Sequence, residues 1–192
     1  MTALPRLLVL TDRTQCTGPM VATVAAAVDA GARAVVLREK DLAGSERARL
    51  AGELDAVLAP VGGLLMLAGP GDGPAVHLAA ADDLPFPRPA LVGRSCHSAA
   101  ELDRAQAEGC DWVMLSPYAA TPSKPGYGPA LGAAGLAALL AGRATPRVYA
   151  LGGVWPDDVA GCLAAGAHGV AVMGPVMRDP GLVAAYLAAL DS

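Results

Sequence analysis

The chain has 192 residues, in which 14 lysines and arginines face 18 aspartates and glutamates, for a formal net charge of −4 at pH 7. This length suits a single domain over residues 1–192, and the acidic balance without runs of like charge argues against nucleic acid as a partner. Hydrophobic residues make up 54% of the chain. Glycine, proline or charge interrupts every apolar run before it could span a membrane, so no membrane partner is expected.

The four cysteines are scattered without the spacing of metal ligands, which is typical of free thiols in a reducing compartment. The first twelve residues have too short an apolar core, and no cleavage site, to predict a signal peptide. The sequence therefore predicts a cytoplasmic protein.

Eight short apolar runs recur along the chain, and each is typical of a buried parallel strand. These strands are expected at residues 7–10, 34–37, 64–67, 76–78, 90–93, 112–115, 148–151 and 169–173. Helices are expected between most of them, at residues 19–30, at 45–60 with Ser45 as the cap, at 99–108 with a capping box of Ser98 and Glu101, after the long loop that follows residue 115, and from Pro180. Residues 70–74 are too short and too rich in glycine and proline for a helix, so the third crossover should be abbreviated.

This alternation predicts an α/β fold, a single (β/α)₈ TIM barrel of parallel strands closed by right-handed crossovers. An open doubly wound sheet is the main alternative. Polar and glycine residues follow nearly every strand of this chain, whereas an open sheet would concentrate them at one switch point. The barrel would bring these residues to a single rim.

Glycines end the last two expected strands, as Gly152 and Gly153 after the seventh and as Gly174 after the eighth. Glycine leaves backbone N–H groups approachable, and a helix that begins just beyond adds a positive dipole. The pair of strand ends therefore predicts a phosphate-binding cup, as in the last two loops of a phosphate-binding barrel. The alternative is two buried strands with ordinary turn glycines.

Cationic and hydroxyl side chains follow several other strands and would face the glycines across the barrel mouth. They are Arg38, Lys40, Ser95, Thr121, Ser123 and Lys124. Three cations and three hydroxyls indicate a site for anionic, doubly phosphorylated contents. Taken singly, each could instead belong to a solvated strand end, a helix cap or a flexible loop.

His97 follows the fifth strand and precedes a capped helix, which suits it for proton transfer, although it could also pack at the helix N-terminus. His77 lies inside the fourth strand and is expected to be a hydrogen-bonded core residue. Asp82 could bind Mg²⁺ together with phosphate oxygens, or could cap a short turn.

These features together resemble the family of thiamine phosphate synthases and thiazole tautomerases. The residues that carry the resemblance are those at 37–40 (LREK), 76–78 (VHL) with Asp82, 93–97 (GRSCH), 121–124 (TPSK), 151–153 (LGG) and 166–173 (GAHGVAVM). The combination covers nearly the whole chain and is specific, whereas a match to LREK or GG alone would be weak evidence for the family.

The resemblance implies a role for each matching position. In the synthase, a thiazole nitrogen attacks hydroxymethylpyrimidine diphosphate with the help of Mg²⁺, and pyrophosphate leaves. The diphosphate would be held by the cationic and hydroxyl residues at positions 38, 40, 95, 121, 123 and 124. Asp82 would be a Mg²⁺ ligand, while Gly153, Val172, Met173 and Gly174 would form the cup for the thiazole phosphate.

The chain departs from the synthase pattern at Val36, where the family usually has glutamine, and at Ala68, where an Asn-Asp pair is usual. Each lost hydrogen bond to a buried polar group costs about 1–3 kcal/mol. The retained cup and His97 then favour a thiazole tautomerase, an isomerase that needs no cofactor and uses His97 as acid and base to aromatise a thiazole carboxylate phosphate.

Two alternatives stay open beside the tautomerase. The first is the transferase, thiamine phosphate synthase, which would need Mg²⁺ and which the retained cations favour. The second is a non-catalytic protein that binds thiamine phosphate or thiazole phosphate. In each case the partner is a small thiazole phosphate, and a homo-oligomer is possible.

Overall fold

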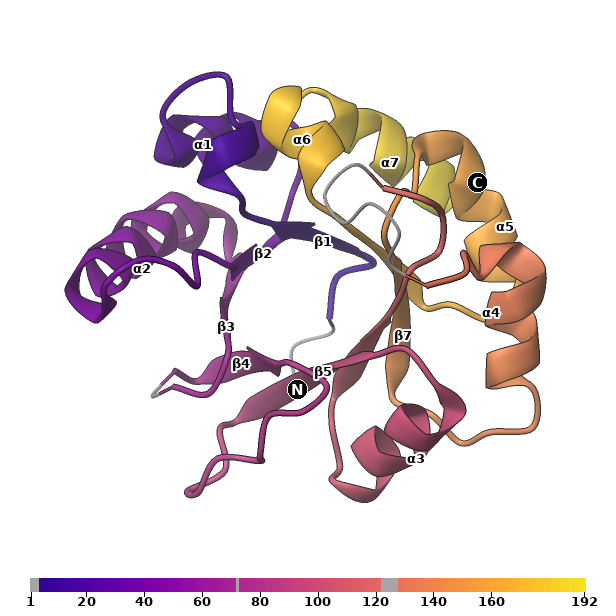
Figure 1. Ribbon diagram of the computed structural model, residues 1–192. Coiled ribbons are helices and arrows are strands. Elements are labelled where there is room, and N and C mark those ends of the chain that lie inside the picture. Colours follow the sequence, from indigo (N-terminus) through magenta and orange to yellow (C-terminus); the bar gives the residue numbers. More distant parts are fainter. Residues whose placement is uncertain (1–3, 72, 122–127) are drawn as a thin grey trace.

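The computed structural model describes residues 4–71, 73–121 and 128–192. Its eight parallel strands form a closed barrel in chain order, in which β1 pairs with both β2 and β8 (Figure 1). The strands are β1 (Leu7–Leu10), β2 (Ala34–Leu37), β3 (Leu64–Ala68), β4 (Ala75–Leu78), β5 (Leu91–Cys96), β6 (Trp112–Leu115), β7 (Arg147–Leu151) and β8 (Gly169–Val172). The (β/α)₈ prediction is confirmed, and the pairing of β1 with β8 excludes the open sheet.

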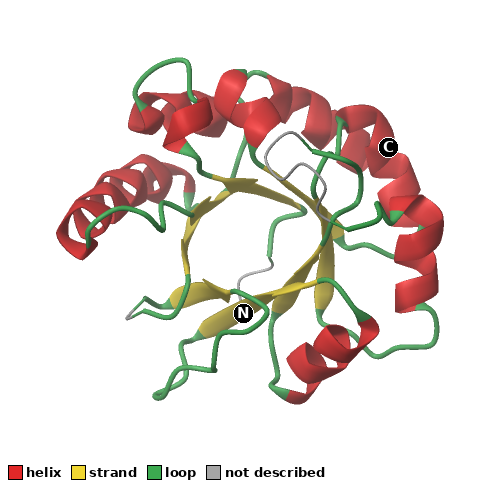
Figure 2. Cartoon of the chain, in the orientation of Figure 1, coloured by secondary structure: helices red, strands yellow, loops and turns green. Residues whose placement is uncertain are grey.

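Helices cover most of the outside of the barrel (Figure 2). They are η1 (Arg13–Gln15), α1 (Met20–Asp29), α2 (Gly44–Leu58), η2 (Ala59–Val61), α3 (Ala99–Ala107), α4 (Gly132–Leu140), η3 (Pro156–Asp158), α5 (Val159–Ala164), α6 (Gly174–Arg178) and α7 (Leu182–Asp191). The described part of the β3–β4 connection holds no helix, so the abbreviated third crossover is confirmed. The fully described β4–β5 connection lacks a helix too, because prolines at 85, 87 and 89 interrupt it.

Two local details differ from the sequence prediction. Strand β5 runs three residues further than expected, so Ser95 lies within the strand and pairs in register with Met114. Helix α2 begins at Gly44, and its N-cap Ala43 makes no side-chain hydrogen bond, so the expected cap by Ser45 is wrong. Because β5 continues past the expected turn, Ser95 at its polar end is part of the strand near the barrel mouth.

The expected capping box at α3 is half present. Ser98 Oγ accepts a hydrogen bond from the N–H of Glu101 (3.3 Å), as expected. The Glu101 carboxylate accepts from the N–H of His97 (2.5 Å), one residue before the N-cap. This bond ties the backbone of His97 to the first turn of α3.

The lower half of the barrel interior is filled by side chains that alternate along each strand. Leu8, Met66, Trp112 and Tyr149 are buried there. A Cβ at Gly93 would overlap the indole of Trp112, so only glycine at this position of β5 leaves room for the ring. The packed lower half forms the bottom of a hollow that opens at the carboxyl ends of the strands.

The loop that replaces a helix between β4 and β5 is held by a fully buried arginine. Arg94 Nη1 donates to the carbonyl oxygens of Ala79 (3.0 Å), Ala80 (3.1 Å) and Asp82 (2.7 Å), and Nη2 pairs with the Glu108 carboxylate (2.5 Å). Backbone carbonyls that a helix would satisfy internally are thereby bonded to one side chain.

No helix within the described ranges is long and apolar enough to cross a membrane. The cysteines at positions 16, 96, 110 and 162 carry free thiols. Burial raises the pKa of the Cys96 thiol to about 12, so this thiol stays protonated in the core.

Candidate active site

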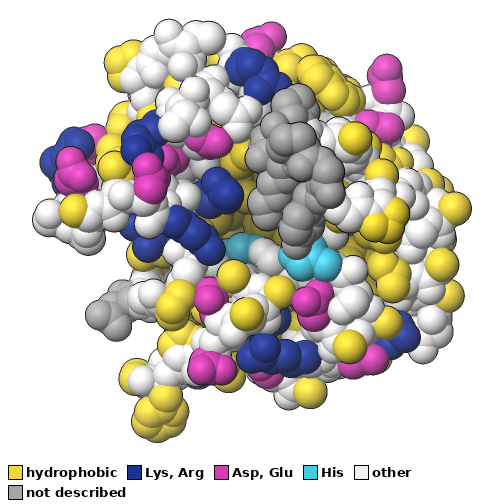
Figure 3. Space-filling view, in the orientation of Figure 1, with side chains coloured by type: hydrophobic (Ala, Val, Ile, Leu, Met, Phe, Trp, Pro, Cys, Tyr) yellow, Lys and Arg dark blue, Asp and Glu magenta, His cyan; other side chains and the backbone are white. Residues whose placement is uncertain are grey.

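A cavity of about 690 Å³ opens at the carboxyl ends of the strands. Figure 3 shows the hollow from its mouth, with Lys and Arg side chains gathered on one side and histidine side chains beside them. Its volume lies in the range of sites for small molecules and cofactors. The mouth is where (β/α)₈ enzymes place their active sites.

The floor of the cavity is apolar where β1, β2, β3 and β8 contribute to it. Leu10, Val36, Ala68 and Ala171 line it, and none of these side chains is more than 4% exposed to solvent. The positions at which the family resemblance implied polar pyrimidine anchors, Val36 and Ala68, are therefore open to the cavity. They offer a contact surface for a ring and no side-chain hydrogen bonds.

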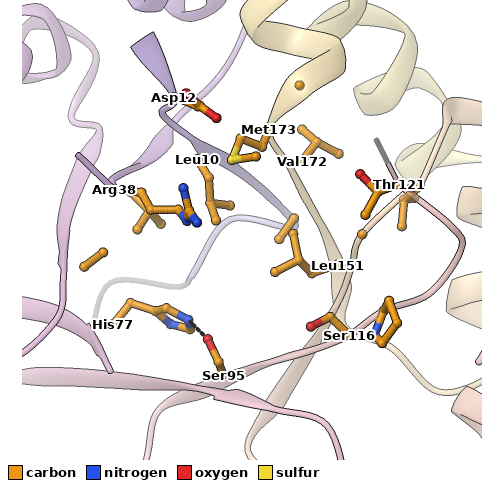
Figure 4. A pocket seen from close by; sticks show the side chains of 18 of the residues that line it. Leu10, Asp12, Arg38, His77, Ser95, Ser116, Thr121, Leu151, Val172 and Met173 are labelled. Atoms are coloured by element: carbon orange, nitrogen blue, oxygen red, sulfur yellow. Dashed lines mark hydrogen bonds between the residues drawn. The ribbon is translucent and has the colours of Figure 1, made fainter. Parts of the chain in front are cut away.

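A polar pair from β4 and β5 completes the floor. His77 Nε2 lies 2.9 Å from Ser95 Oγ (Figure 4), and its ring stacks near Trp112 at 6.0 Å between centroids. His77 is buried and hydrogen-bonded, as expected for a core residue, but it also lines the cavity. Its Nδ1 is buried with no hydrogen-bond partner in the described part of the chain. A histidine inside a strand has the pattern of a core residue, so its place in the cavity could not be predicted from the sequence.

Burial lowers the pKa of His77 to about 3, with smaller contributions from the charges of Lys40 and Arg94. The neutral ring is therefore the form present near pH 7. It carries one N–H donor and one acceptor, of which the Ser95 hydroxyl uses one.

This lowered pKa predicts a pH-dependent stability. Above pH 6.5 neither state holds the His77 proton, and between 6.5 and about 3 only the unfolded state takes it up. The free energy of unfolding of the wild type should therefore fall more steeply with falling pH than that of His77→Asn, by about 1.4 kcal/mol per pH unit. Urea unfolding at pH 7.5, 6.5, 5.5 and 4.5 measures both slopes. Parallel slopes would contradict a buried, neutral His77.

The predicted cations Arg38 and Lys40 both border the cavity at the end of β2. Glu39 between them faces the other way and is 3% exposed. Its carboxylate accepts hydrogen bonds from the Arg13 backbone N–H (3.1 Å) and from Arg13 Nη1 (2.8 Å), and Arg38 N donates to Thr11 Oγ1 (2.9 Å). Arg13 neutralises the intervening carboxylate, so the positive charge of the two flanking residues faces the cavity.

The predicted glycine cup lies on the other side of the cavity, at the ends of β7 and β8. Gly152, Gly153, Val172, Met173 and Gly174 all border the cavity. Gly153 has a φ of +67°, and a Cβ there would lie 2.7 Å from the carbonyl oxygen of Ala120. Both the backbone conformation and the close approach of this loop require glycine.

The loop after β6 is joined to the cup by its backbone. Tyr118 N donates to Leu151 O (2.9 Å), and Ala119 N donates to Gly152 O (2.8 Å). Thr121, at the end of this described segment, borders the cavity as expected (Figure 4). The predicted residues Ser123 and Lys124 lie outside the described residues.

His97 borders the cavity, as the sequence predicted, and its ring is held by the end of β6. Its Nδ1 donates to the Ser116 carbonyl oxygen (2.8 Å) and lies 3.2 Å from Ser116 Oγ. A carbonyl can only accept, so the neutral ring carries its proton on Nδ1 and has Nε2 as its acceptor atom.

Asp82, the predicted Mg²⁺ ligand, is not among the residues that border the cavity. Its Oδ2 accepts a hydrogen bond from the N–H of Ala79 (2.7 Å), which closes the turn after β4. This is the turn-capping role that the sequence analysis kept as the alternative. The metal-binding role of Asp82 stays a prediction.

Besides His77, the polar residues that border the cavity without having been predicted for the site are Asp12, Gln15, Glu101, Ser116 and Arg178. Asp12 Oδ1 accepts from Thr14 Oγ1 (2.6 Å) and Asp12 Oδ2 accepts from Gln15 Nε2 (2.7 Å). Burial acts to raise the pKa of Asp12, but these hydrogen bonds outweigh it and lower the pKa. A signal for Arg178 was present in its position four residues after the cup glycine Gly174.

The described residues do not form a preassembled magnesium site. No group of three His, Cys, Asp or Glu side chains within them could hold a metal ion. The carboxylates on the cavity wall, Asp12 and Glu101, already accept hydrogen bonds from their own loops. Mg²⁺ can also be bound largely by substrate phosphates and water. The Mg²⁺ requirement of the synthase alternative therefore stays a prediction.

The structure is a (β/α)₈ barrel whose cavity lies where enzymes of this fold place their active sites, with cations on one side of the mouth and a glycine cup on the other. A family model described as thiamine monophosphate synthase matches residues 7–176, so the chain belongs to this family. A putative thiamine-phosphate synthase of Geobacter sulfurreducens is 36% identical over 91% of this chain and 87% of that protein. A thiamine-phosphate synthase of Methanoculleus marisnigri is 37% identical, over 93% and 90%.

The fold also agrees with a solved structure. A thiamine phosphate pyrophosphorylase from Pyrococcus furiosus superposes with a TM-score of 0.82 over 97% of this chain and 95% of that chain, at 23% identity. At 23% identity this similarity shows a shared fold and no more.

These comparisons correct the main functional prediction. The tautomerase, and with it the isomerase class, is wrong, because the matching family and the similar relatives are synthases and none of the findings supports a tautomerase branch. The prediction gave too much weight to the two apolar positions Val36 and Ala68, and too little to the retained cations. The acid and base role of His97 was predicted for that reaction.

Proposed function

We propose that this protein is a thiamine phosphate synthase, a transferase that joins hydroxymethylpyrimidine diphosphate to a thiazole phosphate and releases pyrophosphate. The observation that carries the proposal is a cavity bordered by cations on one side and by a glycine cup on the other. Arg38 and Lys40 lie on one side, and the glycine cup with Gly152, Gly153 and Gly174 lies on the other. Two phosphorylated substrates fit this arrangement better than a single phosphate ester does.

The cationic side suits the diphosphate. Arg38 is half-buried at the strand end and Lys40 is more exposed, while Glu39 between them is paired with Arg13. Because Glu39 is paired with Arg13, it does not neutralise the two positive charges, which can act on a ligand. A guanidinium and an ammonium placed at the diphosphate stabilise the negative charge that grows as pyrophosphate leaves.

The apolar floor suits the rings of the two substrates. Leu10, Val36 and Ala68 present an apolar surface, and His77 with Ser95 supplies the polar contact beside it. In this chain the pyrimidine would be placed mainly by shape and by the His77–Ser95 pair. The absence of the implied glutamine and asparagine side chains therefore lowers the selectivity for this pyrimidine over other rings. It does not remove the site for the pyrimidine ring.

The reaction then forms one bond and breaks one. The thiazole nitrogen lone pair forms a C–N bond to the methylene carbon of the pyrimidine, and the C–O bond to the diphosphate breaks. Pyrophosphate leaves with that electron pair, and the thiazole nitrogen becomes cationic. The cup holds the thiazole by its phosphate, and Arg38 and Lys40 hold the leaving group, so the residues of this chain align nucleophile and leaving group on opposite sides of the reacting carbon.

The proposal is tested by incubating the purified protein with both substrates in a buffer that contains Mg²⁺. We expect pyrophosphate and thiamine phosphate to form in equal amounts, and neither to form when either substrate is left out. Coupled pyrophosphate detection and chromatography measure the two products. Tight binding of thiamine phosphate without any turnover would contradict the transferase and indicate a ligand-binding protein.

A further inference from the structure

Arg178 carries a positive charge at the edge of the glycine cup. It ends helix α6, is exposed, and borders the cavity together with Gly174. Within residues 4–71, 73–121 and 128–192, its guanidinium makes one hydrogen bond, from Nη1 to Gln15 Oε1 (2.7 Å), and no ion pair. A cation held by a neutral amide keeps its charge available for an anionic ligand.

Gln15 is itself oriented, so the position of Arg178 is defined by the fold. The Gln15 Nε2 donates to Asp12 Oδ2 (2.7 Å), which leaves Oε1 to accept from Arg178. Gln15 and Arg178 are 163 residues apart and meet because β8 closes the barrel against β1. This chain of hydrogen bonds joins the loop after β1 to the cup.

The guanidinium lies directly on the backbone of the cup. A Cβ at Gly174 would be 2.5 Å from Gln15 Oε1, and 2.8 Å and 3.2 Å from Nη1 and Nη2 of Arg178. Both terminal nitrogens are thus close to the glycine whose backbone borders the cavity. A phosphate in the cup would lie beside them, and the planar guanidinium fork matches two phosphate oxygens.

We propose that Arg178, held in place by Gln15, binds the phosphate monoester in the glycine cup and makes the site select phosphorylated over unphosphorylated ligands. This inference rests on the proposed function for the identity of the ester. Arg38 and Lys40 bind the diphosphate on the other side of the cavity. Different cations therefore bind the two anions, and Arg178 binds the phosphate monoester. The backbone of the cup supplies shape and N–H donors, and Arg178 supplies the charge.

The test compares binding of thiamine phosphate and of thiamine, which lacks the phosphate, by isothermal titration calorimetry. We expect Arg178→Gln to weaken thiamine phosphate binding about tenfold and to leave thiamine binding unchanged, because a charge-assisted bond to phosphate is lost. Arg178→Lys should fall between wild type and Arg178→Gln. Equal thiamine phosphate affinity in wild type and Arg178→Gln would overturn the inference, as would an equal loss with thiamine.

The matched control is Arg143→Gln. Arg143 lies before β7 at the opposite end of the barrel, and its Nη1 pairs with Asp103 (2.5 Å), so the ligand affinities should not change. Calorimetry requires no turnover. A wild type that binds thiamine phosphate without forming it would contradict the proposed function but leave this comparison intact, and a wild type that binds no thiamine phosphate would overturn both.

Discussion

Replacement of Arg38 by glutamine is expected to lower kcat/KM for thiamine phosphate formation by about 100-fold or more, because a donor aimed at developing negative charge is removed. Arg38 is half-buried at the cavity wall, and its backbone N–H is fixed by Thr11 Oγ1 at 2.9 Å. Glutamine keeps a polar side chain but is shorter and loses the charge and the fork of donors. Steady-state kinetics of pyrophosphate release measure the effect.

The same strand offers the control for this experiment. Arg33 precedes β2 at its amino end, where Nη1 donates to the carbonyl oxygens of Val28 (3.0 Å) and Ala32 (2.8 Å). Arg33→Gln removes the same charge from the far end of the barrel, so we expect kcat/KM to stay within twofold of wild type, as roughly holds for distant surface changes. If both variants lost activity equally, net charge and not the position of Arg38 would be the cause.

Replacement of Arg94 by methionine should lower the free energy of unfolding by about 3 kcal/mol, because it breaks a buried charged network from one side. Arg94 is 0% exposed and bonds three carbonyl oxygens of the β4–β5 loop as well as Glu108. Methionine would fill part of the volume but leave these carbonyls without their donor. Urea unfolding followed by circular dichroism measures the loss.

Arg104 is the matched control for Arg94 because it contacts the same carboxylate and the same loop. Its Nε pairs with Glu108 (2.7 Å), and its Nη1 donates to Ala80 O (3.1 Å), but its side chain is 39% exposed. Solvent can replace these bonds, so Arg104→Met should cost no more than about 1 kcal/mol. Equal losses in the two variants would show that burial does not determine the contribution of this network.

The Arg94 network also concerns the site, because the loop that it holds borders the cavity at Ala79, Ala80 and Ala81. In most of this barrel a helix anchors the segment that follows a strand. Between β4 and β5 one buried side chain does this instead, since the prolines of the connection prevent a helix. A residue that does not itself border the cavity thereby shapes its wall.

Several features of the fold could be predicted from local sequence because each depends on neighbouring residues. Apolar runs of four or five residues are long enough for a buried strand and too short for a helix, and glycine or proline ends most of them. The breaker-rich segment after β3 could hold no helix whatever surrounded it. The end of β5 was predicted less well, because Arg94 is a charged residue inside the strand and its burial depends on the distant Glu108.

The candidate site could be predicted where polar residues follow a strand directly. Arg38, Lys40, His97, Thr121 and the cup glycines all border the cavity as expected. His77 was missed because its side chain points into the barrel from within a strand, and the pattern of one strand does not show how deep the cavity reaches. The reaction was predicted wrongly because the apolar residues Val36 and Ala68 were given more weight than the retained cations Arg38 and Lys40.

The sequence by itself determined the eight strands, their parallel order and the glycine cup, because periodicity and turn residues act within a few positions of the chain. Only the tertiary structure decided which side chains share the cavity. His77 meets Ser95 across two strands, and Gln15 meets Arg178 across 163 residues, because the barrel closes β8 onto β1. Closure is a long-range property of all eight strands, and it places cations and cup on two sides of one cavity, the arrangement on which our proposal of two anionic substrates rests.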